Sequence, residues 1–159
     1  MQIVSKIIEA HLFRLDGNDI EFLLLKRSDN DNLYPGLWQM VSGSIHENEK
    51  AFATALREIK EETGLAPKKF WTVPHVNSFY EPQKDELNLV PVFAAQINNG
   101  DDVVLSHEHS TYKWVSTGDA IEMLAWKGQK ESVRTIADYF TNRLNTLNLL
   151  EINIPGSIK

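Results

Sequence analysis

The sequence contains no cysteine, no long apolar run and no cluster of basic residues. Without cysteine the chain forms no disulfide, and it has neither a thiol nucleophile nor a cysteine-ligated zinc site. No apolar run approaches the roughly 20 residues that a helix needs to cross a bilayer, and the first residues do not resemble a signal peptide. The net charge of −6, without a basic stripe, argues against a nucleic-acid polymer as the main partner. We therefore expect a soluble, cytoplasmic protein that binds neither membranes nor nucleic-acid polymers.

The length and composition are those of one globular domain. The chain has 159 residues, of which 42% are hydrophobic and 24% charged, enough to bury a full core. We expect a single domain over residues 1–150. A C-terminal tail should follow over residues 151–159, held loosely because it contains Pro155 and Gly156.

The pattern of apolar residues predicts a mixed α/β fold. Residues 3–14 and 20–26 read as a hairpin, and residues 37–41, 69–80, 87–97 and 112–115 as further strands. Pro74 and Pro91 require an edge or a bulge in their strands. Helices are expected over residues 47–63, where Gly64 ends the helix, from 116 or 117 to about 126, and from 131 to about 147. The order of these elements predicts a mixed sheet covered by helices on both sides.

Residues 43–65 carry the strongest sign of chemistry. Glu58, Glu61 and Glu62 share one face of the predicted helix, where like charges repel by a few tenths of a kcal/mol per pair. A hard divalent cation such as Mg²⁺ takes oxygen ligands and would neutralise them. By themselves, however, three glutamates also fit a solvated helix face. Arg57 is placed to fix the rotamer of a neighbouring carboxylate.

The spacing of this segment resembles the Nudix box. The matching positions are Gly43, Glu49, Arg57, Glu58, Ile59, Glu61, Glu62, Gly64 and Leu65. The resemblance implies a Nudix-type α/β/α sandwich with a mixed β-sheet between helices, and a hydrolase that uses Mg²⁺, with Mn²⁺ as a substitute. It implies metal ligands at Glu58, Glu62 and Glu61, with the Gly43 carbonyl as an addition, and an orienting role for Arg57. Glu49 fits either an orienting partner of Arg57 or an acidic residue that favours the first turn of the helix.

A later segment extends the resemblance. Residues 105–109 and 112–114 are similar to a segment shared by dihydroneopterin triphosphate pyrophosphatases and asymmetrical diadenosine tetraphosphate hydrolases. In that comparison Glu108 occupies the place of a glutamate that approaches the metal from a loop. Glu108 is therefore expected as a metal ligand or as the general base, and the sequence does not choose between Glu61 and Glu108 as the base.

The substrate is less well defined. Residues 38–44 resemble the dihydroneopterin triphosphate branch, whereas residues 20–25 and 107–109 fit the diadenosine branch. The first expectation is a pyrophosphohydrolase that cleaves a nucleoside or dihydroneopterin triphosphate to the monophosphate and pyrophosphate by attack of water at phosphorus. The alternatives are a dinucleoside polyphosphate hydrolase and a nucleotide sensor without turnover. Substrate contacts are expected from Arg27, Ser42, Lys6 and Trp38, in a monomer or a homodimer.

Overall fold

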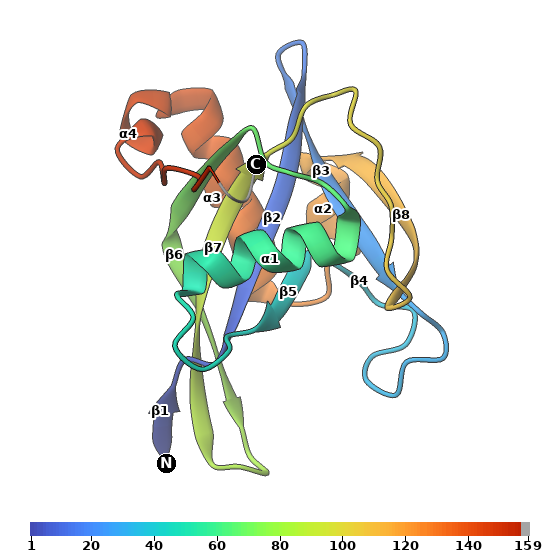
Figure 1. Ribbon diagram of the computed structural model, residues 1–159, viewed down its shortest axis with the longest axis vertical. Helices are drawn as coiled ribbons and strands as arrows, with labels where there is room; N and C mark the ends of the chain where they lie inside the picture. Colours follow the sequence, from blue (N-terminus) through green and yellow to red (C-terminus); the bar gives the residue numbers. More distant parts are fainter. Residues whose placement is uncertain (157–159) are drawn as a thin grey trace.

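The computed structural model describes residues 1–156, in which helices cover both faces of one mixed sheet (Figure 1). The α/β sandwich expected from the sequence is therefore confirmed. Its strands are β1 (Gln2–Val4), β2 (Ile7–Asp16), β3 (Asp19–Arg27), β4 (Trp38–Gln39), β5 (Val41–Ser44), β6 (Lys69–Glu81), β7 (Glu86–Gln96) and β8 (His109–Ser116). Its helices are α1 (Ala51–Thr63), α2 (Thr117–Met123), α3 (Lys127–Asn142) and α4 (Leu144–Asn148).

Strand β2 lies at the centre of the sheet. It pairs in parallel with β7 on one side, and β7 continues the sheet through its antiparallel partner β6. On the other side β2 forms the expected hairpin with β3, which pairs antiparallel with β8. The short strands β4 and β5 follow one another and pair with β3 and β2 respectively. This arrangement holds Gly43 in β5, opposite Ile8 of β2, directly before the loop that leads to α1.

Alternating side chains of the strands divide the core into two parts. On β2, Ile8, Ala10 and Leu12 belong to the cluster that packs against α1, whereas Phe13 belongs to the cluster on the opposite face. Helix α1 contacts β5 and β2, and helices α2 and α3 contact β3, β8 and β6. Because successive side chains of a strand point to opposite faces of the sheet, β2 contributes to the core cluster on each face.

The boundaries of α1 differ from the prediction at one end. The helix begins at Ala51 instead of residue 47, because Asn48 has a φ of 63° and cannot continue a right-handed helix. It ends as predicted at Gly64, which has a φ of 70° and donates its N–H to the Lys60 carbonyl.

Several other boundaries also shift. The expected strand over residues 3–14 is divided into β1 and β2, and the expected last helix is divided into α3 and α4 at Arg143, whose φ of −136° is not helical. A register shift between Thr72 and Val76 confirms the irregularity expected around Pro74.

The segment expected to be a loose tail is held to the sheet at its start. The Ile152 N–H donates to the Phe70 carbonyl at 2.7 Å, and Ile152 and Ile154 pack against the core cluster below α1. Residues 157–159 of that expected tail lie outside the described residues. Within residues 1–156, no helix combines the length and the apolar character that a bilayer-spanning segment requires.

Candidate functional site

Arg57 is the centre of the hydrogen-bond network on the outer face of α1. Its Nε and Nη2 donate to the two carboxylate oxygens of Glu49 at 2.9 and 3.0 Å. Nη2 also donates to the Ser44 carbonyl at 3.0 Å, and Nη1 donates to Glu58 at 2.7 Å and to Glu61 at 3.4 Å. One bond from Nε and two from each Nη engage all five guanidinium donors. Arg57 is therefore fixed in one orientation.

The role left open for Glu49 is settled by its position. Glu49 precedes the helix and has no place in its first turn, and its carboxylate also accepts hydrogen bonds from the Thr54 hydroxyl and the His46 N–H. The Arg57 guanidinium, followed by Thr54 and His46, holds the pKa of Glu49 well below its ordinary range. Glu49 is thus the partner that orients Arg57.

Gly43 allows Glu58 to approach the end of β5. A Cβ added to Gly43 would lie 2.2 Å from the carboxyl carbon of Glu58, so no larger residue fits there without displacing that carboxylate. Burial raises the pKa of Glu58, the Arg57 guanidinium opposes this effect, and Glu61 and Glu108 add to it. Glu58 therefore lies within the electrostatic field of two further carboxylates.

Glu62 is the most buried acidic side chain of the site, with 3% of its surface exposed. Its Oε2 is buried without a hydrogen-bond partner among the described residues. Burial raises its pKa to about 9, with further contributions from Glu108 and Glu58, while the Ser42 backbone and Arg27 act in the opposite direction. A buried carboxyl oxygen with no partner is costly, which points to a ligand that the protein alone does not supply.

Glu108 reaches the same carboxylates from a separate loop. Hydrogen bonds from Val104 and Ser106 to the carbonyls of Thr63 and Glu62 tie this loop to the end of α1. The Glu108 carbonyl accepts a hydrogen bond from the Ser28 N–H at 3.0 Å. Glu108 is exposed, and its charge raises the pKa of both Glu58 and Glu62. The structure thus brings Glu108 to the box, as the sequence predicted.

The donor atoms of these residues are of the kind that binds a divalent cation. Their donors are carboxylate and carbonyl oxygens, which Mg²⁺ and Mn²⁺ prefer, and Glu62 offers an oxygen that has no partner in the described part of the chain. Among residues 1–156, however, no three His, Asp or Glu side chains are already gathered closely enough to hold a metal ion. Arg57 holds one oxygen of Glu58 and one of Glu61, so a cation would have to draw these side chains together. Their assignment as metal ligands stays a prediction.

The four expected substrate contacts are not all brought together. Arg27 ends β3, and its guanidinium forms an ion pair with Asp31. The Ser42 backbone lowers the pKa of the Glu62 carboxyl, which places both residues at the site. Trp38 is half-buried beneath the Lys113 ammonium, 5.4 Å from the ring centroid.

Lys6 is engaged elsewhere in the structure. Its ammonium lies 2.7 Å from Glu86, at the start of β7, and its side chain is 55% exposed. The expected contact between Lys6 and substrate stays a prediction, because no ligand contact tests it.

Two further contacts were not predicted from the sequence. His109, expected in a polar loop, begins β8 with 5% exposure, and its Nε2 lies 2.8 Å from the amide nitrogen of Gln39. Burial and the nearby Arg27 lower the pKa of His109 to about 4. Tyr34 and Trp126, both about half exposed, form an edge contact with ring centroids 5.6 Å apart. The sequence carries no local signal for either pair because each joins distant segments.

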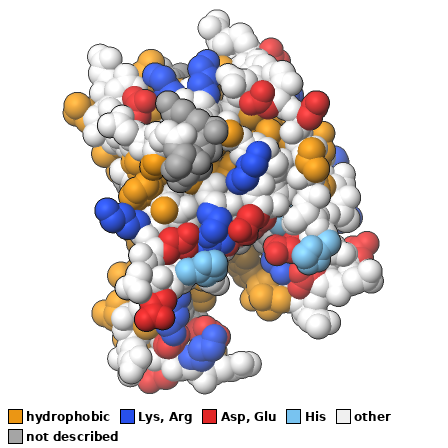
Figure 2. All heavy atoms as spheres, viewed as in Figure 1, with side chains coloured by type: hydrophobic (Ala, Val, Ile, Leu, Met, Phe, Trp, Pro, Cys, Tyr) orange, Lys and Arg blue, Asp and Glu red, His pale blue; other side chains and the backbone are white. Residues whose placement is uncertain are grey.

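The charged network borders a hollow in the molecular surface. Figure 2 shows acidic, basic and histidine side chains along α1, above a hollow between the β6–β7 hairpin and the loop that follows β3. A pocket of about 210 Å³ lies between the loop after β3 and the loop before β8, and is lined by Ser28, Asn30, Asp31, His107 and Glu108. It therefore connects Glu108 with the segment that follows Arg27.

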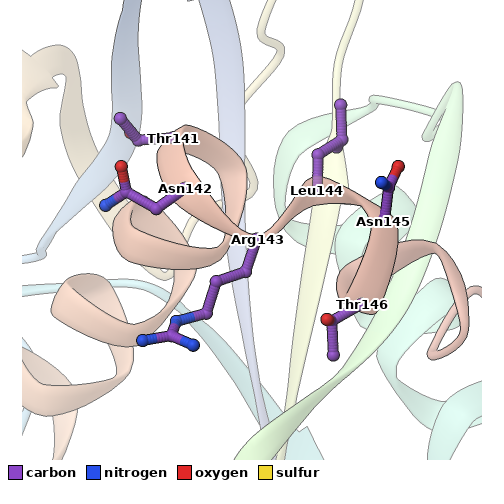
Figure 3. A pocket seen from close by; sticks show the side chains of 6 residues that line it. All are labelled: Thr141, Asn142, Arg143, Leu144, Asn145 and Thr146. Atoms are coloured by element: carbon purple, nitrogen blue, oxygen red, sulfur yellow. The ribbon is translucent and has the colours of Figure 1, made fainter.

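A second pocket contains none of the expected site residues. It has a volume of about 460 Å³ and is lined by residues 141–146 at the junction of α3 and α4. Figure 3 shows the polar side chains of Asn142, Arg143 and Asn145 pointing away from one another, so they do not converge on one point. The pocket beside Glu108 is the better candidate for chemistry.

Several known proteins of similar sequence or structure are named as hydrolases of nucleotides. The asymmetrical bis(5′-nucleosyl)-tetraphosphatase of Caenorhabditis elegans is 35% identical over 123 residues, which are 76% of this chain and 86% of that protein. Nucleoside triphosphatase NudI of Escherichia coli O81 (strain ED1a) is 25% identical over 111 residues, 65% of this chain and 79% of NudI. The crystal structure of a C. elegans Ap4A hydrolase binary complex is similar with a TM-score of 0.70 and 28% identity, covering 86% of this chain and 97% of that one.

The profile of the NUDIX domain matches residues 8–139, a range that contains Arg27, Gly43, all four box glutamates and Glu108. Proteins of this family generally use divalent metal ions, in keeping with the oxygen donors of the site. The chain therefore belongs to the NUDIX family and is a Nudix hydrolase.

Proposed function

We propose that this Nudix hydrolase cleaves dinucleoside tetraphosphates asymmetrically, with Mg²⁺ as the metal. The observation that carries the hydrolytic part is Glu62, a buried carboxyl with an unpartnered oxygen and a raised pKa beside Glu58 and Glu108. The tetraphosphate substrate is supported by the 35% identity to the C. elegans tetraphosphatase over most of both chains. The reaction adds water across one phosphoanhydride bond, so that Ap4A and water give ATP and AMP.

In this proposal Glu58, Glu62 and Glu61 hold the cation together with the Gly43 carbonyl. When bound, the cation neutralises phosphate charge and makes a bound water more acidic. Arg57 keeps Glu58 and Glu61 oriented, because all of its donors are engaged. Glu49 keeps Arg57 in place through its bidentate ion pair.

We assign the general base to Glu108 in preference to Glu61. Glu61 is already paired with Arg57, whereas Glu108 is exposed beside the pocket and faces Glu58 and Glu62. Its carboxylate would accept the proton of the attacking water, whose oxygen bonds to phosphorus while the bond from phosphorus to the bridging oxygen breaks. The leaving phosphate oxygen carries away the bonding electron pair.

The substrate would lie across the hollow in Figure 2. Arg27 is the best-placed cation for a phosphate, because it is the last residue of β3 and directly precedes the segment that lines the pocket. Tyr34 and Trp126 offer exposed aromatic faces for a base, and Ser42 and Trp38 remain further candidates. Lys6 would take part only if it left Glu86.

A nucleoside triphosphate is the second candidate substrate, cleaved to the monophosphate and pyrophosphate. It is favoured by the similarity to NudI and by residues 38–44, which resemble the dihydroneopterin triphosphate branch. The sequence alone placed this substrate first, and the identity to the tetraphosphatase reverses the order.

Product analysis distinguishes these functions. The purified protein is incubated with Ap4A, or with each nucleoside triphosphate and dihydroneopterin triphosphate, in Mg²⁺ or in EDTA. We expect ATP and AMP from Ap4A in Mg²⁺ alone. Nucleoside monophosphate and pyrophosphate from a triphosphate, with Ap4A intact, would favour the second candidate. Tight nucleotide binding without any product in Mg²⁺ or Mn²⁺ would refute hydrolysis and indicate a sensor.

A further inference from the structure

The ion pair between Arg27 and Asp31 is placed beside the acidic cluster without belonging to it. Nη2 of Arg27 donates to Oδ2 of Asp31, and both side chains are about four-fifths buried. Nε of Arg27 is buried and has no hydrogen-bond partner among the described residues. A guanidinium offers five N–H donors, so Arg27 retains donors for a second anionic group.

Asp31 is itself held by the turn that contains it. Its Oδ1 accepts the Leu33 N–H at 2.8 Å, and its own N–H donates to the Ser28 carbonyl at 3.0 Å. The hydrogen bond from Leu33, followed by Arg27, lowers the pKa of Asp31, so its carboxylate is charged at neutral pH. One oxygen of Asp31 thus fixes the loop, and the other is directed at Arg27.

The same loop adjoins the proposed metal ligands. The Ser28 N–H donates to the Glu108 carbonyl, and Asp31 and Glu108 line the same pocket of about 210 Å³. The charge of Arg27 also lowers the pKa of Glu62. A guanidinium released from Asp31 would therefore find Glu62, with its unpartnered oxygen, and Glu108 as competing anionic partners.

We propose that Asp31 is a positioning residue that holds the Arg27 guanidinium away from Glu62 and Glu108. These carboxylates then stay free for a divalent cation, and Arg27 stays paired with Asp31, which lines the pocket where substrate phosphate would lie. The inference rests on the proposed function for the metal and the phosphate. Without Asp31, Arg27 forms an ion pair with the metal ligands and competes with the cation.

Asp31→Asn tests this role without disturbing the turn, because asparagine keeps an oxygen that accepts the Leu33 N–H. Binding of Mn²⁺ to the substrate-free protein is measured by electron paramagnetic resonance. We expect the apparent Kd of Asp31→Asn to rise about tenfold or more, as for other residues that orient metal ligands. Asp29→Asn is the matched control: it makes the same change in the same loop at an exposed residue, and its Kd should stay at the wild-type value.

A double-mutant cycle with Arg27→Gln separates competition by Arg27 from a general loss of negative charge. In our proposal Arg27→Gln changes Mn²⁺ affinity little in the wild-type background. In the Asp31→Asn background it raises Mn²⁺ affinity about tenfold, back toward the wild-type value. An equal effect of Arg27→Gln in both backgrounds would overturn the proposal, because additive charge effects would then explain the data. Wild-type affinity in Asp31→Asn would overturn it as well.

The Mn²⁺ binding measurements do not depend on turnover. If wild-type protein hydrolyses no nucleotide but the Mn²⁺ cycle shows the expected coupling, the proposed function fails and the role of Asp31 stands. If turnover is found and the coupling is zero, the role of Asp31 fails and the function stands. Circular dichroism and thermal unfolding of each variant show whether the fold is intact, so that a folding defect is not read as lost binding.

Discussion

Replacing Glu62 by glutamine should stabilise the metal-free protein at neutral pH while it removes activity. The carboxyl is 3% exposed, and burial with the charges of Glu108 and Glu58 raises its pKa to about 9 from an ordinary 4.5. A raised pKa in the folded state means that stability is fully present below pH 4.5 and is lost as the pH rises toward 9. Glutamine is neutral at every pH and has nearly the same shape as glutamic acid, so the variant does not lose this stability as the pH rises.

The magnitude follows from the same pKa. Each pKa unit corresponds to about 1.4 kcal/mol, so Glu62 makes the metal-free protein about 3 kcal/mol less stable at pH 7 than at pH 4.5. In EDTA, Glu62→Gln should therefore match the wild type at pH 4.5 and exceed it by up to about 3 kcal/mol at pH 7. In Mg²⁺ the order should reverse, because the wild type gains stability from the bound cation and the variant gains little.

Urea unfolding followed by tryptophan fluorescence measures both effects across pH 4.5–8, in EDTA and in Mg²⁺. The control is Glu61→Gln, the same change at the adjacent residue, whose side chain is 58% exposed. This control should shift stability by only a few tenths of a kcal/mol. A Glu62→Gln protein that is less stable than the wild type at pH 7 in EDTA would refute the reasoning. Superimposable pH profiles would refute it equally.

Three further predictions follow from other contacts of the site. Gly43→Ala should leave the circular dichroism spectrum unchanged and lower turnover about tenfold or more, because its Cβ displaces the flexible end of Glu58 and spares the backbone. Arg57→Lys should lower the free energy of unfolding in urea by roughly 1.5 kcal/mol or more, since an ammonium cannot reproduce the bidentate bond to Glu49; an unchanged value would contradict this. His109 has its pKa lowered to about 4 from 6.5, so wild-type stability should fall by about 3 kcal/mol relative to His109→Gln as the pH drops from 6.5 to 4, and parallel urea-unfolding profiles would contradict the lowered pKa.

The sequence predicted best those features that depend on neighbouring residues. The apolar period of α1, the stop at Gly64 and the two apolar runs that form the β2–β3 hairpin are local patterns, and the structure reproduces them. The predicted start of α1 was wrong by four residues, because Asn48 takes a left-handed conformation that the sequence pattern does not indicate. The expectation that Glu108 lies near the box carboxylates came from the resemblance of residues 105–109, and the structure places its charge near Glu58 and Glu62. The role of Glu108 stays a prediction.

Contacts formed by tertiary packing could not be predicted in the same way. Glu49 was expected either as a partner of Arg57 or in the first turn of the helix, and the sequence did not decide between them. The late start of the helix decides it, because Glu49 lies before the helix and folds back onto Arg57. His109 looked like an exposed loop residue, yet pairing of β8 with β3 buries it against Gln39. Arg27 was expected to face substrate, but its bond to Asp31 depends on the turn that follows β3.

If Glu58, Glu61 and Glu62 hold a cation as we propose, these restraints account for how the glutamates stay available to it although two arginines lie beside them. A free guanidinium near Glu58, Glu61 and Glu62 would neutralise them and occupy the oxygens that a metal needs. The Nε and Nη2 atoms of Arg57 donate to Glu49 and Ser44, so only Nη1 donates to Glu58 and Glu61. We infer the same logic for Arg27, whose bond to Asp31 draws it into the loop beside the pocket. In each case a carboxylate outside the proposed metal ligands restrains the arginine, and within residues 1–156 the Oε2 atom of Glu62 has no hydrogen-bond partner.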